Sequence, residues 1–241
     1  MSYYQLFTCN NNIYPSRLIC RFTNDEDDDE NKIFLSKTLR SYIMSSKEKI
    51  DRYEILWDKY KKYVNPYFFM ERLSKYLDKD DIVVADDGAH LTWAIQSLKV
   101  LKQQRLFSAF GNSPMGYAFP AAIGASIALN KKKVVCIDGD GSIQINIQEL
   151  QTLVSNKLPI KIIILNNDGY GIIKQFQELY LQDRHEAVDS KKGVTNPNFS
   201  KISKAYGVNY SEIKKNSDID KILKKTIKSK KAEFINVFTK P

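Results

Sequence analysis

Asp138-Gly139-Asp140-Gly141-Ser142 decides the fold together with a second stretch, Asn166-Asn167-Asp168-Gly169. Each stretch follows an apolar run, VVCI at residues 134–137 and IKIIIL at residues 160–165. Continuous β-branched runs of this length that end in Gly, Asp and Asn are typical of strands buried on both faces. The sequence therefore predicts two buried strands, each followed by a polar turn.

The segment between the two turns has a helical pattern. Apolar residues recur every three or four positions on one side, at Ile143, Ile147, Leu150, Leu153 and Val154. A strand–helix–strand order makes the two strands parallel, with a crossover that is almost always right-handed. If the strands are neighbours, Asp140 and Asn167 meet at one edge of the sheet, where α/β proteins bind their ligands.

The residue types at this edge fit a divalent cation beside a phosphate. Asp140 offers a carboxylate oxygen, Asn167 an amide oxygen and Gly169 a backbone carbonyl. Hard oxygens from few carboxylates suit Mg²⁺, which completes its octahedron with phosphate oxygens and water. Gly141 and Ser142 open the helix, so their free N–H groups point toward any phosphate. On spacing alone, ordinary turn sequence is the alternative interpretation.

A third edge of the same kind lies earlier in the chain. Residues 82–85 (IVVA) are predicted as a strand that ends in Asp86-Asp87-Gly88-Ala89-His90, before a helix over residues 91–97. Further elements are expected as helices at 67–77, 120–126 and 199–206, and as a final strand at 233–238. The expected fold class is α/β, a three-layer α/β/α sandwich with a mainly parallel sheet, preceded by a helical N-terminal segment.

These motifs together resemble a known family. Gly139-Asp140-Gly141-Ser142, with Asn166-Asn167 one strand later, is similar to the thiamine-diphosphate signature. The resemblance extends over three flanking motifs: Glu149-Leu150-Gln151-Thr152, Leu158-Pro159-Ile160-Lys161 and Gly169-Tyr170-Gly171. From about Asn65 to the C-terminus, the chain resembles the diphosphate-binding domain of acetolactate synthase-like enzymes. This implies a domain at residues 65–241, after an N-terminal loop and helical connector at residues 1–64.

The resemblance implies thiamine diphosphate and Mg²⁺ as cofactors and assigns roles to residues of this chain. Asp140, Asn167 and Gly169 would hold the metal. The cofactor-binding set would be Gly88, His90, Ser113, Met115, Gly139, Asp140, Gly141, Ser142, Asn167, Gly169 and Gly171. Within this set His90 would contact the diphosphate, Met115 would support the bent cofactor, and the Ser113 carbonyl would accept from its aminopyrimidine. Without the resemblance, His90 could equally cap local structure, and Met115 would be core filler.

The resemblance also implies what must complete the site. In the family, a glutamate on a separate pyrimidine-binding domain activates the cofactor, usually from a neighbouring subunit. No matching pattern is recognised here, so no catalytic residue is assigned. We expect a homo-oligomer or a separate pyrimidine-binding subunit to complete a lyase or transferase acting on 2-keto acids. The family typically has tryptophan where Phe176 stands, which leaves the acceptor substrate open. A truncated, non-catalytic homologue is the alternative.

The composition favours one substantial domain with an appendage. The 241 residues are 43% hydrophobic, but no apolar run is long enough to span a membrane and no signal core begins the chain, so we expect a cytoplasmic protein. Cys9, Cys20 and Cys136 lack metal or redox spacing. The formal charge of +9 could indicate nucleic-acid binding. We favour a solvated helix face at residues 214–231, because Ile219, Ile222, Leu223 and Ile227 form an apolar stripe within it.

Overall fold

The computed structural model describes residues 62–101 and 103–240. Cys9, Cys20 and almost all of the predicted N-terminal loop and connector, residues 1–64, lie outside this range. The first described helix, α3 (Pro66–Ser74), is capped by Asn65, whose side chain accepts N–H groups of the first helical turn. The predicted domain boundary near Asn65 stays a prediction, because most of the segment before it is not described.

The centre of the fold is a six-stranded sheet in which every pair of neighbouring strands is parallel. The strand order is β2-β1-β3-β4-β6-β5. The strands are β1 (Ile82–Ala85), β2 (Arg105–Phe107), β3 (Val134–Gly139), β4 (Lys161–Asn166), β5 (Asn209–Ile213) and β6 (Glu233–Phe238). The predicted strands at 134–137 and 160–165 correspond to β3 and β4, which are neighbours in the centre of the sheet.

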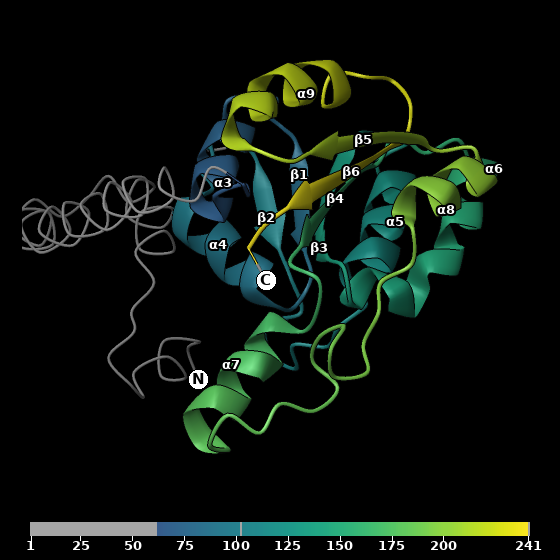
Figure 1. Ribbon diagram of the computed structural model, residues 1–241. Coiled ribbons are helices and arrows are strands. Elements are labelled where there is room, and N and C mark those ends of the chain that lie inside the picture. The colour runs from purple at the N-terminus through teal and green to yellow at the C-terminus, as the bar shows by residue number, and fades with distance from the viewer. Residues whose placement is uncertain (1–61, 102, 241) are drawn as a thin grey trace, which may run out of the picture.

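Helices cover both faces of this sheet, as Figure 1 shows. One face carries α3, α4 (Ala89–Ser97) and α9 (Ile219–Thr226), and the other carries α5 (Ala118–Ala128), η2 (Ser142–Glu149), α6 (Leu150–Ser155) and α8 (Phe199–Tyr206). Alternate residues of a strand pack into the hydrophobic cores on opposite faces of the sheet. Val83 and Ala85 face α3 and α4, whereas Val84 faces α5. The predicted three-layer α/β/α sandwich is thus confirmed.

The crossover between β3 and β4 is less regular than the predicted single helix. It starts as the 3₁₀ helix η2 and continues as α6, with non-helical backbone angles at Asn146 (φ −127°, ψ 29°). The side chain of Asn146 donates to the carbonyl oxygen of Gly116 at 2.5 Å, so the break connects the crossover to a neighbouring loop. Ile143, Leu150 and Leu153 are buried as predicted, whereas Ile147 and Val154 are half-buried.

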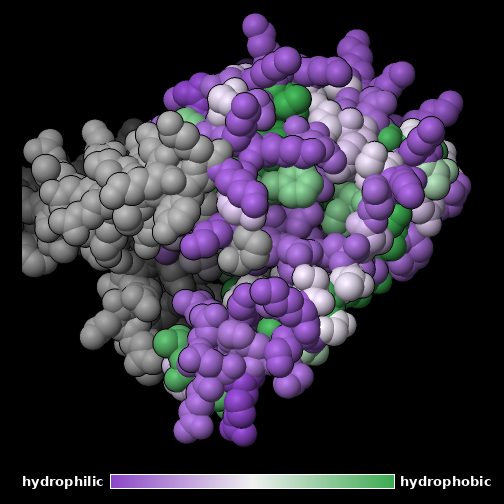
Figure 2. All heavy atoms as spheres, viewed as in Figure 1, coloured by the Kyte–Doolittle hydropathy of each residue, from purple (hydrophilic) through white to green (hydrophobic). Residues whose placement is uncertain are grey.

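The lysine-rich segment near the C-terminus has the predicted solvated face. Ile219, Leu223 and Ile227 are fully buried beneath α9, while its lysines are exposed. Figure 2 shows hydrophilic side chains over the region where Figure 1 places α9. Cys136 is buried within β3, as expected for a small core residue. No helix in the described part of the chain is both long and apolar enough to cross a membrane.

One helix stands apart from both layers. α7 (Gly171–Tyr180) follows β4 and projects below the sheet in Figure 1, with none of its residues buried. The side chain of Phe176 on this helix is 52% exposed. Its ring packs against the ring of Tyr180, with the two centroids 4.8 Å apart. In Figure 2 the same region shows hydrophobic residues among hydrophilic ones. The short η3 (Asn216–Asp218) completes the described elements.

Candidate functional site

The carboxyl ends of β1, β3 and β4 form one edge of the sheet, and a pocket lies there. Because β3 and β4 pair up to Gly139 and Leu165, the turns that follow them are neighbours. Every predicted site residue except Ser113 lines this pocket, which also includes Asp87, Ala89, Trp93, Leu165, Tyr170, Ile172 and Ile173. The predicted meeting of Asp140 and Asn167 is therefore present in the structure.

Three oxygens converge at this meeting point. The side-chain amide of Asn167 fits in two orientations, of which one places its NH₂ group 2.9 Å from the Gly169 carbonyl oxygen and 3.0 Å from Asp140 Oδ1. In that orientation the amide donates to both acceptors. In the other, its oxygen occupies the same place, so that three oxygens face one another without a donor between them. A cation bound between the three oxygens would offset their repulsion in the second arrangement.

Asp140 is 1% exposed, and its two carboxylate oxygens have different surroundings. Oδ2 accepts the Gly169 N–H at 2.9 Å and the Asn196 side-chain amide at 2.5 Å, whereas Oδ1 faces Asn167. Burial raises the pKa of Asp140 to about 6, although the hydrogen bonds from Asn196 and Gly169 lower it. Asp140 therefore has one oxygen held by donors and one directed at the other two oxygens.

The turns of the pocket require glycine because other atoms approach them closely. A Cβ on Gly141 would lie 2.3 Å from the ring of Tyr170, and a Cβ on Gly169 would lie 2.1 Å from the Val188 carbonyl oxygen. Gly169 also has φ +155°, which L-residues rarely adopt. Glycine at these two positions therefore lets the Tyr170 ring and the 188–189 segment pack directly against the turns of the pocket.

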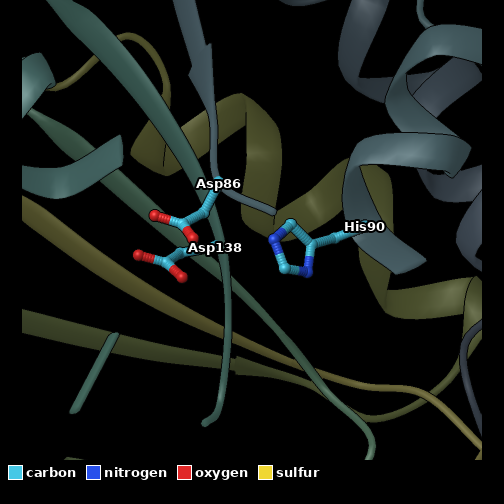
Figure 3. A group of neighbouring side chains, drawn as sticks. All are labelled: Asp86, His90 and Asp138. Carbon is cyan, nitrogen blue, oxygen red and sulfur yellow. The ribbon is translucent and has the colours of Figure 1, made fainter. Parts of the chain in front are cut away.

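Figure 3 shows a buried cluster of Asp86, His90 and Asp138, of which His90 lines the pocket. One carboxylate oxygen from each aspartate and one ring nitrogen of His90 lie within 4.8 Å of one another, and that ring nitrogen faces the carboxylates. Burial raises the pKa of both aspartates and lowers the pKa of His90 to about 4, so the imidazole is neutral at neutral pH. His90 Nε2 and Asp138 Oδ2 have no hydrogen-bond partner.

Each aspartate of this cluster fixes a different part of the pocket. Asp86 accepts the N–H groups of Gly116 at 3.0 Å and Ala118 at 2.6 Å, which holds the loop that carries Met115. Asp138 accepts the Ser142 hydroxyl and the Gly139 N–H. Because the Ser142 hydroxyl is engaged in this way, its backbone N–H is the group left to meet an anion in the pocket.

The comparison with known families decides the assignment. The family model for the thiamine pyrophosphate enzyme C-terminal TPP-binding domain matches residues 86–237, which include every residue that lines the pocket. The chain belongs to this family. Its TPP-binding domain is similar to the acetolactate synthase large subunit of Porphyra purpurea, with 35% identity over 190 residues that cover 77% of this chain and 32% of that protein.

Two further relatives are also acetolactate synthase large subunits. The acetolactate synthase isozyme 2 large subunit of Escherichia coli (strain K12) is 34% identical over 155 residues, which are 64% of this chain and 28% of that protein. The large subunit of Parasynechococcus marenigrum (strain WH8102) is 42% identical over 132 residues, which are 55% and 21% of the two chains. The TPP-binding domain described here thus spans about a third or less of the length of these relatives.

Most of the residues predicted to bind the cofactor line this pocket of the TPP-binding domain, but the prediction did not include other residues that contact them. Ser113 lies on the Met115 loop with φ +45° and an exposed side chain, outside the pocket lining, so its role stays a prediction. The sequence offered a clue to Asp86 and Asp138, since each is an acidic residue at the end of an apolar strand. The sequence offered no such clue to Asn196, because it lies 56 positions from Asp140 along the chain.

Proposed function

We propose that this chain binds thiamine diphosphate through Mg²⁺ held by Asp140 Oδ1, the Asn167 amide oxygen and the Gly169 carbonyl oxygen. The separations of 2.9 and 3.0 Å around Asn167 carry this proposal. Mg²⁺ binds oxygens at about 2.0–2.1 Å in an octahedron, so adjacent ligands lie about 2.9 Å apart. The residues present therefore fit the metal with the amide oxygen of Asn167 turned inward, and phosphate oxygens and water would complete the shell.

The remaining residues of the pocket fit the organic part of the cofactor. The glycine turns after β1 and β3 present backbone to the diphosphate, and neutral His90 adds no charge to compete with the metal. Met115, Ile172 and Ile173 give the pocket an apolar wall that would exclude water. When bound, the cofactor supplies the electron sink needed to decarboxylate a 2-keto acid.

We further propose that this domain is the diphosphate-binding part of an acetolactate synthase-like enzyme, completed by a pyrimidine-binding partner. Two observations support this: the relatives are acetolactate synthase large subunits, and the pocket, among the described residues, is lined by aspartate but by no glutamate. The partner, a second copy or another subunit, would provide the activating glutamate. The acceptor substrate stays open because Phe176 stands where the family typically has tryptophan.

Calorimetric titration with thiamine diphosphate, with and without Mg²⁺, tests the cofactor assignment. We expect binding that requires Mg²⁺ in the wild type and is lost in Asp140→Ala. Glu71→Ala is the control, because Glu71 lies on α3 outside the pocket lining, where its carboxylate pairs with Lys75 at 3.9 Å. Equal binding by Asp140→Ala and wild type would refute the metal assignment. Turnover of 2-keto acids after addition of a pyrimidine-binding domain separates the enzymatic proposal from a non-catalytic homologue.

A further inference from the structure

The structure assigns to Asn196 the role of a positioning residue for the metal-binding carboxylate. Asn196 lies on the loop between α7 and α8, outside the motifs that identify the family. We infer that it fixes Asp140 so that only Oδ1 is presented to a metal ion. This inference rests on the proposed function, since it concerns the same metal, but it assigns a residue that the site motifs do not include.

The hydrogen bonds of Asp140 carry the inference. The Asn196 amide donates to Oδ2 at 2.5 Å, and the Gly169 N–H donates to the same oxygen at 2.9 Å. With two donors on Oδ2, the carboxylate cannot exchange its oxygens by rotating without breaking both bonds. Oδ1 is then the oxygen left facing Asn167 and the Gly169 carbonyl. The result is a carboxylate prepared to bind a cation through one oxygen.

The orientation of the Asn196 amide is itself determined. Gln144 on η2 donates through Nε2 to Asn196 Oδ1 at 2.9 Å and to the Asp140 carbonyl oxygen at 2.9 Å. Because the Asn196 oxygen accepts from Gln144, its NH₂ group must face Asp140. The same NH₂ group also lies 3.4 Å from Asp168 Oδ1, at the Asn-Asn turn. Asn196 therefore connects η2 with both turns that would hold the metal.

The loop that carries Asn196 is tied to the site at its other end. The Tyr170 N–H donates to the Val188 carbonyl oxygen at 2.8 Å, and Gly169 forms a bridge with Asp189. Lys174 on α7 pairs with Asp189 at 3.1 Å. The loop is thus attached beside Gly169, and Asn196 is the point at which it returns to the metal carboxylate.

The expected consequence of losing Asn196 is weaker metal binding with an intact cofactor pocket. Groups that hydrogen-bond to metal ligands orient them, and removing such a group typically weakens metal affinity by about 10–100-fold. Asn196→Ala removes one of the two donors on Oδ2 and leaves every predicted metal ligand in place. Gln144→Ala tests the same relay from the other side, since it removes the contact that orients Asn196 without touching the Asp140 carboxylate.

Asn198 provides a matched control on the same loop. Its side chain caps α8 by accepting the Lys201 N–H at 3.0 Å. Asn198→Ala is therefore expected to lower the thermal unfolding midpoint without changing metal affinity. Comparing Asn196→Ala with Asn198→Ala separates a specific effect on Asp140 from general loosening of the loop.

The experiment is a titration of Mn²⁺, as a spectroscopic substitute for Mg²⁺, into the full chain with thiamine diphosphate present. Free Mn²⁺ is followed by electron paramagnetic resonance, and each variant is also melted. We expect Asn196→Ala to bind Mn²⁺ about 10–100-fold more weakly than wild type. Gln144→Ala should weaken binding in the same direction, and the double variant should lose less than the two single effects combined. Asn198→Ala should match wild type.

Asp140→Ala separates failure of this inference from failure of the proposed function. If wild type binds no Mn²⁺, or Asp140→Ala binds it equally well, the metal site itself is wrong and the role of Asn196 falls with it. If wild type binds Mn²⁺ and Asp140→Ala does not, yet Asn196→Ala and Gln144→Ala both match wild type, then only the positioning role is refuted.

Discussion

Gly169 is the position where the geometry of the site makes its most demanding prediction. A Cβ added there would lie 2.1 Å from the Val188 carbonyl oxygen and 3.2 Å from the Asp189 Cα, whereas real Cβ contacts essentially never fall below 3.0 Å. Both neighbours are backbone, so a side chain cannot simply turn away. Gly169→Ala must therefore push the 188–189 segment off the turn or change the turn itself.

The expected cost has three parts. A non-glycine residue at φ +155° costs about 1–3 kcal/mol of backbone strain. Separation of the two segments removes the hydrogen bond from the Tyr170 N–H to Val188, which contributes about 1 kcal/mol. Distortion of the turn also weakens the bond from the Gly169 N–H to the Asp140 carboxylate, for which about 1.5–3 kcal/mol is typical. We expect a total loss of about 3.5–5 kcal/mol in the free energy of unfolding, smaller than the sum of the maxima because the segment relaxes.

Gly193→Ala is the control for this prediction. Gly193 also has positive φ (+91°), but no atom lies within 4 Å of the position of its Cβ, so only backbone strain applies. Urea unfolding should show that Gly169→Ala is at least about 2 kcal/mol less stable than Gly193→Ala, because only Gly169 has the additional contacts. Calorimetry should show that Gly169→Ala alone loses Mg²⁺-dependent binding of thiamine diphosphate. Equal losses of stability and unchanged binding in both variants would refute the close contact on which the argument depends.

Two further predictions concern pH and a helix. The pKa of Asp140 is raised to about 6, so protons compete with the metal below that pH. Mn²⁺ titrations should show affinity that is constant above about pH 7 and falls roughly tenfold per pH unit below 6, and affinity that is flat down to pH 5 would contradict the assignment. The stability of the metal-free protein should change in the opposite direction. Because the pKa of Asp140 is raised in the folded state, its contribution to the free energy of unfolding decreases as pH rises from about 4 to 6. Gly124→Ala in α5 should raise stability by about 1 kcal/mol, since the added Cβ meets no atom within 4 Å, and an unchanged melting temperature would count against it.

Much of the fold could be predicted because its information is local. Runs such as residues 134–137 and 160–165 identify buried strands, and the helical segment between them requires a parallel crossover. Parallel neighbours then place their carboxyl ends together, so Asp140 and Asn167 had to meet once the strands were adjacent. The buried stripe of α9 at Ile219, Leu223 and Ile227 was equally readable, because helical periodicity follows from backbone geometry alone.

Tertiary structure alone decided what surrounds those residues. The donor from Asn196 to Asp140 and the donors from Gly116 and Ala118 to Asp86 join positions 30 to 56 residues apart. The break in the crossover at Asn146 depends on the Gly116 carbonyl, which comes from a different loop. Local sequence sets backbone preference and the pattern of burial, whereas a hydrogen bond across the fold exists only after packing has brought its donor and acceptor together. The proposed metal ligands of this site were therefore visible in the sequence, but the contacts that orient them were not.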